Sequence, residues 1–137
     1  MSELRQDLRE LVAASPFYRW TGMTVATAEP RAVRLELDLE DHHRNLQGFA
    51  HGGMLATIAD AAMGLSVRSA LEPGRRHVTI ELGVHYLRPA TTGKIAASGK
   101  VIRIGTEIAF AEAVVTEASG RELVRATGTY SVTRGRQ

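Results

Sequence analysis

The sequence has no cysteine, few aromatic residues and no long apolar run, and each absence excludes a class of protein. Without cysteine there can be no disulfide framework, no zinc–cysteine site and no thiol nucleophile. One Trp, three Tyr, three Phe and a net charge of +2 give neither the stacking surface nor the basic excess of a nucleic-acid-binding protein. No segment approaches the roughly 18 apolar residues of a membrane span, and residues 1–7 lack a signal-peptide pattern. We therefore expect a cytoplasmic protein with no nucleic-acid or membrane partner.

What is present fits one globular domain, because 44% of the 137 residues are hydrophobic and 23% are charged. The predicted domain covers residues 1–137, with an N-terminal helix in 1–16 and the core in 17–137. The helix is amphipathic and is expected to end at Ser15-Pro16. Its apolar stripe includes Leu8, Leu11 and Val12.

The remaining pattern predicts strands on either side of one long helix. Period-two alternation predicts strands at about 33–39 and 78–86, and the turns along the chain delimit further strands at about 23–28, 94–104, 106–118 and 122–133. In the third strand, one face is expected to carry Val78, Ile80, Leu82, Val84 and Tyr86. A polar loop fills 40–51, and Gly52–Leu71 contains no proline and predicts the helix. Short turns between consecutive strands predict an antiparallel sheet, hence an α+β fold.

The long helix has two different faces. A bulky stripe, expected to face the sheet, consists of Leu55, Ile58, Ala62 and Leu65. The opposite stripe is made mostly of small residues: Gly53, Ala56, Thr57, Asp60, Gly64 and Val67. Because so little of the helix is charged, we expect the second face to be covered as well, by a second copy of the chain.

Asp60 and the start of this helix are candidate functional groups. An aspartate among Ala, Met and Gly could lie at a solvent gap or pair with an arginine, but a covered carboxylate also marks functional sites. His51-Gly52-Gly53 places unobstructed amide groups at the positive end of the helix, where an anion or oxyanion could bind. Eight helical residues span about 12 Å. Asp60 and these amides can therefore act on one carbonyl only if they come from two subunits of a symmetric dimer.

Two other kinds of site are disfavoured. The spacing of His42, His43 and His51 matches no standard set of metal ligands, so no metal is expected. No serine lies in a nucleophile-elbow context, which argues against a Ser-His-Asp triad.

The spacing Asn45-x-x-Gly48-x-x-His51-Gly52-Gly53-x6-Asp60 resembles the signature of the PaaI-type subgroup of hotdog-fold acyl-CoA thioesterases. The segment Val78–Ala90 also resembles the strand that follows the central helix in that family, and the resemblance covers residues 18–133. It implies a curved antiparallel sheet wrapped around the long helix, and dimers that often pair into tetramers.

The resemblance also implies a role for each motif residue. The Gly52 amide would polarise the thioester carbonyl, and Asp60 from the partner chain would act as nucleophile or as general base for water. Asn45 would position the water or substrate, His51 would orient the loop, and Thr79 would assist the carboxylate. Gly48 and Gly53 belong to the same substrate-binding turn. This chemistry needs no metal or redox cofactor, because a thiolate leaves readily near neutral pH.

The acyl-CoA substrate itself is only partly defined by the sequence. Leu55 and Met63 are expected to line the acyl pocket, which would suit an aryl or a medium aliphatic group. Basic residues available for the CoA phosphates are Arg75, Arg76, Arg88, Lys94, Lys100 and Arg103. Two other functions stay open: a hotdog dehydratase or hydratase, and a non-catalytic acyl-CoA-binding protein.

Overall fold

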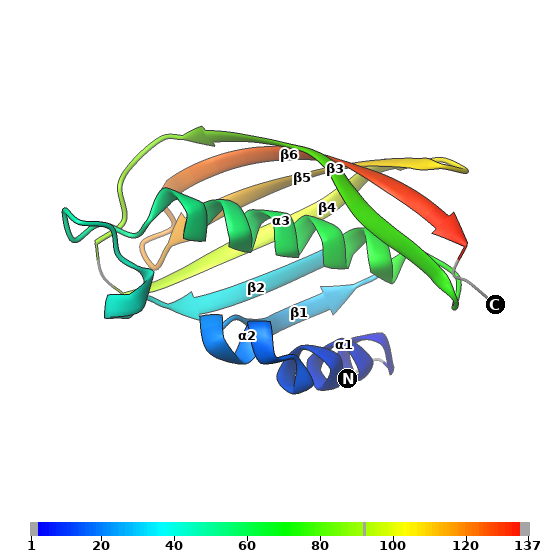
Figure 1. Ribbon diagram of the computed structural model, residues 1–137, viewed down its shortest axis with the longest axis horizontal. Helices are drawn as coiled ribbons and strands as arrows, with labels where there is room; N and C mark the ends of the chain where they lie inside the picture. Colours follow the sequence, from blue (N-terminus) through cyan, green and yellow to red (C-terminus); the bar gives the residue numbers. More distant parts are fainter. Residues whose placement is uncertain (1–2, 92, 135–137) are drawn as a thin grey trace.

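The computed structural model describes residues 3–91 and 93–134, and within them a curved antiparallel sheet wraps one long helix (Figure 1). The α+β fold predicted from the sequence is confirmed. The elements are α1 (Glu3–Ala14), α2 (Pro16–Thr21), β1 (Thr24–Glu29), β2 (Ala32–Asp38), the 3-10 helix η1 (Asp41–His43), α3 (Gly52–Ser69), β3 (Arg75–Tyr86), β4 (Lys94–Ile104), β5 (Ile108–Glu117) and β6 (Glu122–Arg134). No helix in this part of the chain is both long and apolar enough to cross a membrane.

The six strands lie in the order β1-β2-β4-β5-β6-β3, and every neighbouring pair is antiparallel. β3 pairs with β6 and not with β4, the next strand along the chain. The reason is that α3 crosses the concave face, so the chain emerges at the far edge of the sheet (Figure 1). Consequently β3 forms one edge, and α1 and α2 lie beside β1 at the other.

A second short helix, α2, was not predicted. Ser15-Pro16, expected only to end the first helix, also begins the next one, because proline suits the first turn of a helix. Gly22 ends α2 in the left-handed conformation (φ +85°), which favours glycine. Six residues are too few to produce a periodic apolar pattern, so the sequence contained little signal for this element.

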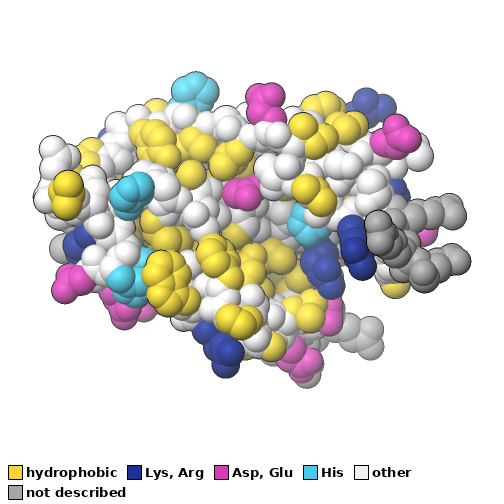
Figure 2. Space-filling model, viewed as in Figure 1, with side chains coloured by type: hydrophobic (Ala, Val, Ile, Leu, Met, Phe, Trp, Pro, Cys, Tyr) yellow, Lys and Arg dark blue, Asp and Glu magenta, His cyan; other side chains and the backbone are white. Residues whose placement is uncertain are grey.

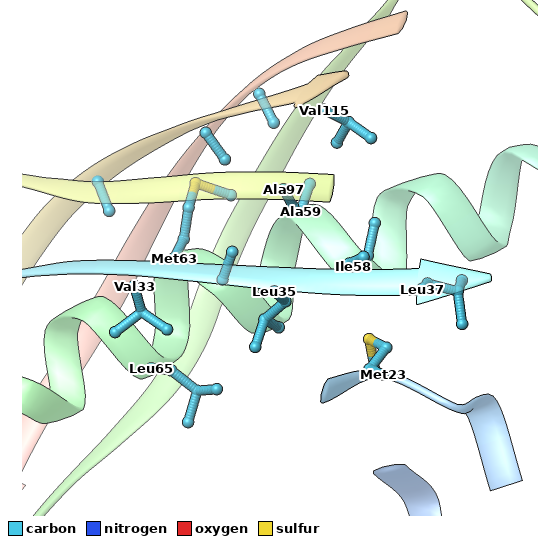
Figure 3. Packing of buried hydrophobic residues seen from close by; sticks show 14 of the residues in the cluster. Met23, Val33, Leu35, Leu37, Ile58, Ala59, Met63, Leu65, Ala97 and Val115 are labelled. Carbon is cyan, nitrogen blue, oxygen red and sulfur yellow. The ribbon is translucent and has the colours of Figure 1, made fainter. Parts of the chain in front are cut away.

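The core lies between α3 and the concave face of the sheet. The bulky stripe of α3 is buried as predicted, with Ile58 and Ala62 at 0% exposure. Figure 3 shows Ile58, Ala59 and Met63 beside Leu35 of β2 and Ala97 of β4. The helix lies so close to β4 that a Cβ on Gly99 would be 2.5 Å from the Ala62 carbonyl oxygen.

The small stripe of α3 is open over only part of its length. Gly53 is exposed, and Ala56, Thr57 and Asp60 are partly exposed. In contrast, Gly64 and Val67 are buried, so the expectation that the whole stripe awaits a second copy is wrong at its C-terminal end. The curled sheet covers this end within the same chain: a Cβ on Gly64 would lie 3.1 Å from Nε2 of His77 in β3.

β3 changes face at a β-bulge. The pairing with β6 runs Thr79↔Tyr130 and then Glu81↔Thr129, which leaves Ile80 as the extra residue. On one face of β3, the side chains therefore belong to odd-numbered residues before the bulge and to even-numbered residues after it. The predicted single face is wrong for Val78 and Ile80, which are 63% and 58% exposed.

Candidate active site

Asp60 is held by two hydroxyl groups from two strands. Its Oδ1 accepts a 2.9 Å hydrogen bond from the Thr79 hydroxyl of β3 and a 2.7 Å hydrogen bond from the Tyr130 phenol of β6. Tyr130 is completely buried. Among the residues that the structure describes, Asp60 forms no ion pair. The alternative that Asp60 pairs with an arginine is therefore wrong for the described part of the chain.

The pKa values of two phenols and one imidazole near this carboxylate are shifted towards their neutral forms. Burial, followed by the hydrogen bond to Asp60 and its charge, raises the pKa of Tyr130 far above its usual range. Burial and the same charge also raise the pKa of Tyr18. Burial lowers the pKa of His77, and so does the positive charge of Arg68, while Asp60 opposes them. All three shifts favour the neutral form of the group, so Tyr130 and Tyr18 keep their hydroxyl hydrogens beside Asp60.

A cavity of about 480 Å³ lies over Asp60, between the N-terminal helices and α3. One wall is apolar and comes from α1 and α2, including Leu8, Leu11 and Phe17. The other wall carries Asp60 and Thr79. Figure 2 shows hydrophobic side chains gathered along this face on both sides of the central helix, with basic side chains and a histidine at one end. The cavity can hold an apolar group next to a carboxylate.

The start of α3 is organised by two side chains. His51 is the N-cap, and its Nδ1 accepts the Gly53 N–H at 2.8 Å. The Tyr86 phenol donates to the Gly52 carbonyl at 2.7 Å. We expected both glycine amides to be available, but the Gly53 N–H is already bonded. The Gly52 N–H has no hydrogen-bond partner among the described residues, which leaves it free to bind an oxyanion.

The polar loop before α3 is ordered by its own side chains. Asn45 Oδ1 accepts the backbone N–H groups of Gln47 and Phe49, at 2.9 and 3.1 Å. Gly48 adopts φ +86°, a backbone conformation that favours glycine in this turn, and a Cβ placed on it would have open space around it. His43 is buried and uses both ring nitrogens, accepting from the Glu40 N–H and donating to the Thr21 carbonyl.

A second hollow of about 300 Å³ lies beside the helix start and includes Asn45, Gly52, Tyr86 and Arg88. The structure therefore separates the predicted site residues into two groups. We call the first half-site, around Asp60, Thr79 and Tyr130, the carboxylate half-site. We call the second, around Gly52, His51, Asn45 and Tyr86, the amide half-site. In one chain they are about 12 Å apart along α3.

Two of the expected substrate contacts are placed differently. Met63 has 0% exposure and packs in the core, so it lines neither cavity. Of the six basic residues proposed for the CoA phosphates, Arg88 alone borders one of the two half-sites, where it also donates to the Glu122 carbonyl. Lys100 forms an ion pair with Glu112 instead.

The residues that sequence reasoning missed are Tyr130, Tyr86 and His77. Tyr130 and Tyr86 look like ordinary strand residues, because aromatic side chains favour β-structure. His77 precedes Thr79 by two positions and so shares its face, which was the available signal. Within the described residues, no group of three or more His, Asp or Glu side chains is arranged to hold a metal ion.

Comparison with known proteins matches residues 47–124, more than half of the chain, to the family model of the thioesterase superfamily. Human acyl-coenzyme A thioesterase 13 is 29% identical over 130 residues, covering 90% of this chain and 92% of the human protein. A Halobacterium salinarum protein is 42% identical over 103 residues, covering 71% of this chain and 68% of that protein.

Solved structures show the same fold. A thioesterase family protein from Silicibacter pomeroyi superposes with a TM-score of 0.89 at 26% identity, covering 96% of this chain and 99% of that one. Escherichia coli PaaI superposes with a TM-score of 0.88 at 16% identity, covering 96% and 94%. The sequence matches identify the chain as a thioester hydrolase and a member of the thioesterase superfamily, and the structural matches show that it has the hotdog fold.

Proposed function

We propose that this protein hydrolyses acyl-CoA thioesters in composite sites, each made of the carboxylate half-site of one subunit and the amide half-site of the other. The observation that carries the proposal is the position of the two half-sites along β3. Thr79 bonds to Asp60 in the first half of this strand, and Tyr86 bonds to Gly52 at its C-terminal end.

An antiparallel pairing of β3 with β3 of a second copy would join the half-sites. β3 is an edge strand of 12 residues, and Val78, Ile80 and Tyr86 on it are more than half exposed. Such an edge favours pairing with another strand. If the two-fold axis passes near Leu82 and Gly83, Thr79 lies opposite Tyr86 of the second copy. Each Asp60 then approaches the Gly52 amide of the other subunit.

The proposed reaction uses the groups in these positions. The Gly52 N–H stabilises the negative charge that develops on the thioester carbonyl oxygen. As general base, Asp60 takes a proton from water while the water oxygen bonds to the carbonyl carbon. The C–S bond then breaks, and the CoA thiolate leaves and takes up a proton. As nucleophile, Asp60 instead forms an anhydride with the acyl group, releases the thiolate, and is regenerated by water.

The remaining residues have supporting roles in this proposal. His51 fixes the first turn of α3 through the Gly53 N–H, and Asn45 shapes the loop beside it. Arg88 is available for the CoA moiety at the amide half-site. The cavity beside α1 and α2 accepts the acyl group, since its apolar wall faces Asp60. The composite site needs only the dimer. A tetramer formed from two such dimers is compatible with it.

The first test measures free thiol release from a panel of aryl and aliphatic acyl-CoAs with a chromogenic thiol reagent. Rapid turnover of at least one thioester supports hydrolysis. Stoichiometric binding without thiol release would instead support an acyl-CoA-binding protein, and hydration of an enoyl-CoA without thiol release would support a hydratase.

The second test asks whether the half-sites complement each other in trans. An Asp60→Ala chain is mixed with a Gly52→Pro chain, which lacks the amide hydrogen, under conditions that allow subunit exchange. Each homodimer is expected to be nearly inactive, whereas a heterodimer contains one intact site. Random mixing makes half the dimers heterodimers, so activity should recover to roughly a quarter of wild type. No recovery despite verified heterodimers would refute the composite site.

A further inference from the structure

The two oxygens of the Asp60 carboxylate have different surroundings. Oδ1 accepts from both Thr79 and Tyr130, whereas Oδ2 has no hydrogen-bond partner among the described residues. Both donors belong to strands, β3 and β6, and the carboxylate also borders the large cavity. On this observation, and resting on the proposed function, we propose that Tyr130 is a positioning residue. Together with Thr79 it anchors Oδ1. This leaves Oδ2 as the oxygen that either attacks the thioester carbonyl carbon or takes a proton from water.

The direction of these hydrogen bonds is fixed by chemistry. An ionised carboxylate can only accept, and the Tyr130 phenol is neutral because burial and Asp60 both disfavour its ionisation. Hydrogen bonds to a charged acceptor are about twice as strong as those between neutral groups. Rotation of the carboxylate would break both bonds at once, so two donors on one oxygen define one orientation for the other oxygen.

The packing around Tyr130 indicates that its ring position is itself fixed. The side chain is fully buried, and a Cβ on Gly128 would lie 2.7 Å from its ring. The His77 ring lies on another side, with centroids 6.1 Å apart. The phenol also lies 3.2 Å from the Asp60 carbonyl oxygen, so the hydroxyl is held against the helix backbone as well as the carboxylate. A ring enclosed in this way can hold Oδ1 with little freedom.

The test compares variants that remove or retain each hydroxyl. Tyr130→Phe and Thr79→Val remove one donor each, and Thr79→Ser retains it. Thr129→Val removes a hydroxyl from the neighbouring position of β6, which faces the other side of the sheet. For each variant, kcat and KM are measured on the best substrate of the acyl-CoA panel, together with the melting temperature.

We expect Tyr130→Phe and Thr79→Val each to lower kcat about 10-fold to 100-fold, with KM changed less than about threefold, as expected when a bond to a charged group that orients the reacting atom is lost. Thr79→Ser should lose much less of kcat than Thr79→Val, because it keeps the donor, and Thr129→Val should keep kcat near wild type. The double variant Tyr130→Phe/Thr79→Val should lose less than the product of the single losses, because both donors hold one oxygen.

A Tyr130→Phe enzyme with kcat within twofold of wild type, while Asp60→Asn is inactive, would overturn this proposal and leave the proposed function standing. An active Asp60→Asn enzyme would instead refute the catalytic role of Asp60 itself. If Tyr130→Phe does not fold, the Thr79 pair tests the same oxygen from another strand. Equal kcat values for Thr79→Ser and Thr79→Val would then overturn the proposal.

Discussion

The carboxylate half-site and the amide half-site are built by different means. Around Asp60 the functional contacts are made by side chains from three elements, and Tyr130 among them is completely buried. At the start of α3 the functional group is a backbone amide, and it is held by local contacts from His51 and by Tyr86. The amide half-site is also more exposed, with His51 and Tyr86 both on the surface.

This difference determines how each half-site should respond to mutation. A backbone N–H survives most substitutions, so the amide half-site should tolerate change in its neighbours. A side-chain carboxylate is lost with a single substitution, and one of its two donors, Tyr130, is fully buried. We therefore expect variants of the carboxylate half-site to have the larger effects on kcat.

The largest effect is expected from Asp60→Asn, which retains the shape of the side chain and removes the base or nucleophile. Thiol release should fall by at least about 100-fold in kcat. Circular dichroism and the melting temperature should show that the fold is intact. Turnover close to wild type would contradict the assignment.

A smaller effect is expected from Gly128→Ala, which moves Tyr130 without removing its hydroxyl. The new Cβ would lie 2.7 Å from the ring, and the buried ring must shift. Overpacking of this kind costs about 1–3 kcal/mol, so the melting temperature should fall and kcat should drop about tenfold. The control is Gly105→Ala in the turn between β4 and β5, whose Cβ meets the Ile108 carbonyl oxygen at 3.1 Å and not Tyr130. Equal kcat values in the two variants would show that the position of Tyr130 is unimportant.

A few-fold effect is expected from Tyr86→Phe in the amide half-site. The substitution removes the bond to the Gly52 carbonyl, and a neutral hydrogen bond is worth about 0.5–1.5 kcal/mol. We expect kcat/KM to fall roughly twofold to tenfold, less than for Tyr130→Phe. A loss larger than that of Tyr130→Phe would reverse the comparison between the half-sites.

The smallest effect concerns the pH dependence of stability. The pKa of His77 is lower in the folded protein than its ordinary value of 6.5, so protonation favours the unfolded chain. Its contribution is fully present above about pH 6.5 and is lost as the pH falls towards the folded pKa. Between pH 7.5 and pH 5.5 the melting temperature of wild type should therefore fall more than that of His77→Gln. Parallel curves would show that His77 makes no such contribution.

The sequence predicts the fold well where long periodic segments exist. The long helix ends two residues before its predicted boundary, and all six predicted strands are present. Helix α2 is too short to show a period. The position of β3 beside β6 depends on how α3 crosses the sheet, which no local pattern encodes.

The site is predictable to the extent that its residues violate local rules. Asp60 is recognisable because a carboxylate is unusual in an apolar helix, and Gly52 because two glycines begin that helix. Tyr130 obeys every local rule for a strand, and its function exists only through contact with a helix 70 positions away. The capping of the Gly53 N–H by His51 likewise depends on a side-chain conformation.

The bulge at Ile80 reverses the alternation of side chains between the two faces of β3. Thr79 and Tyr86 are seven positions apart, an odd spacing, yet both contact α3. A regular strand could place only one of them against the helix. One inserted residue thus allows a single edge strand to serve both half-sites. Inserting or deleting two residues between Thr79 and Tyr86 would keep both side chains on the face of β3 that contacts α3. Inserting or deleting one residue would turn one of them to the opposite face.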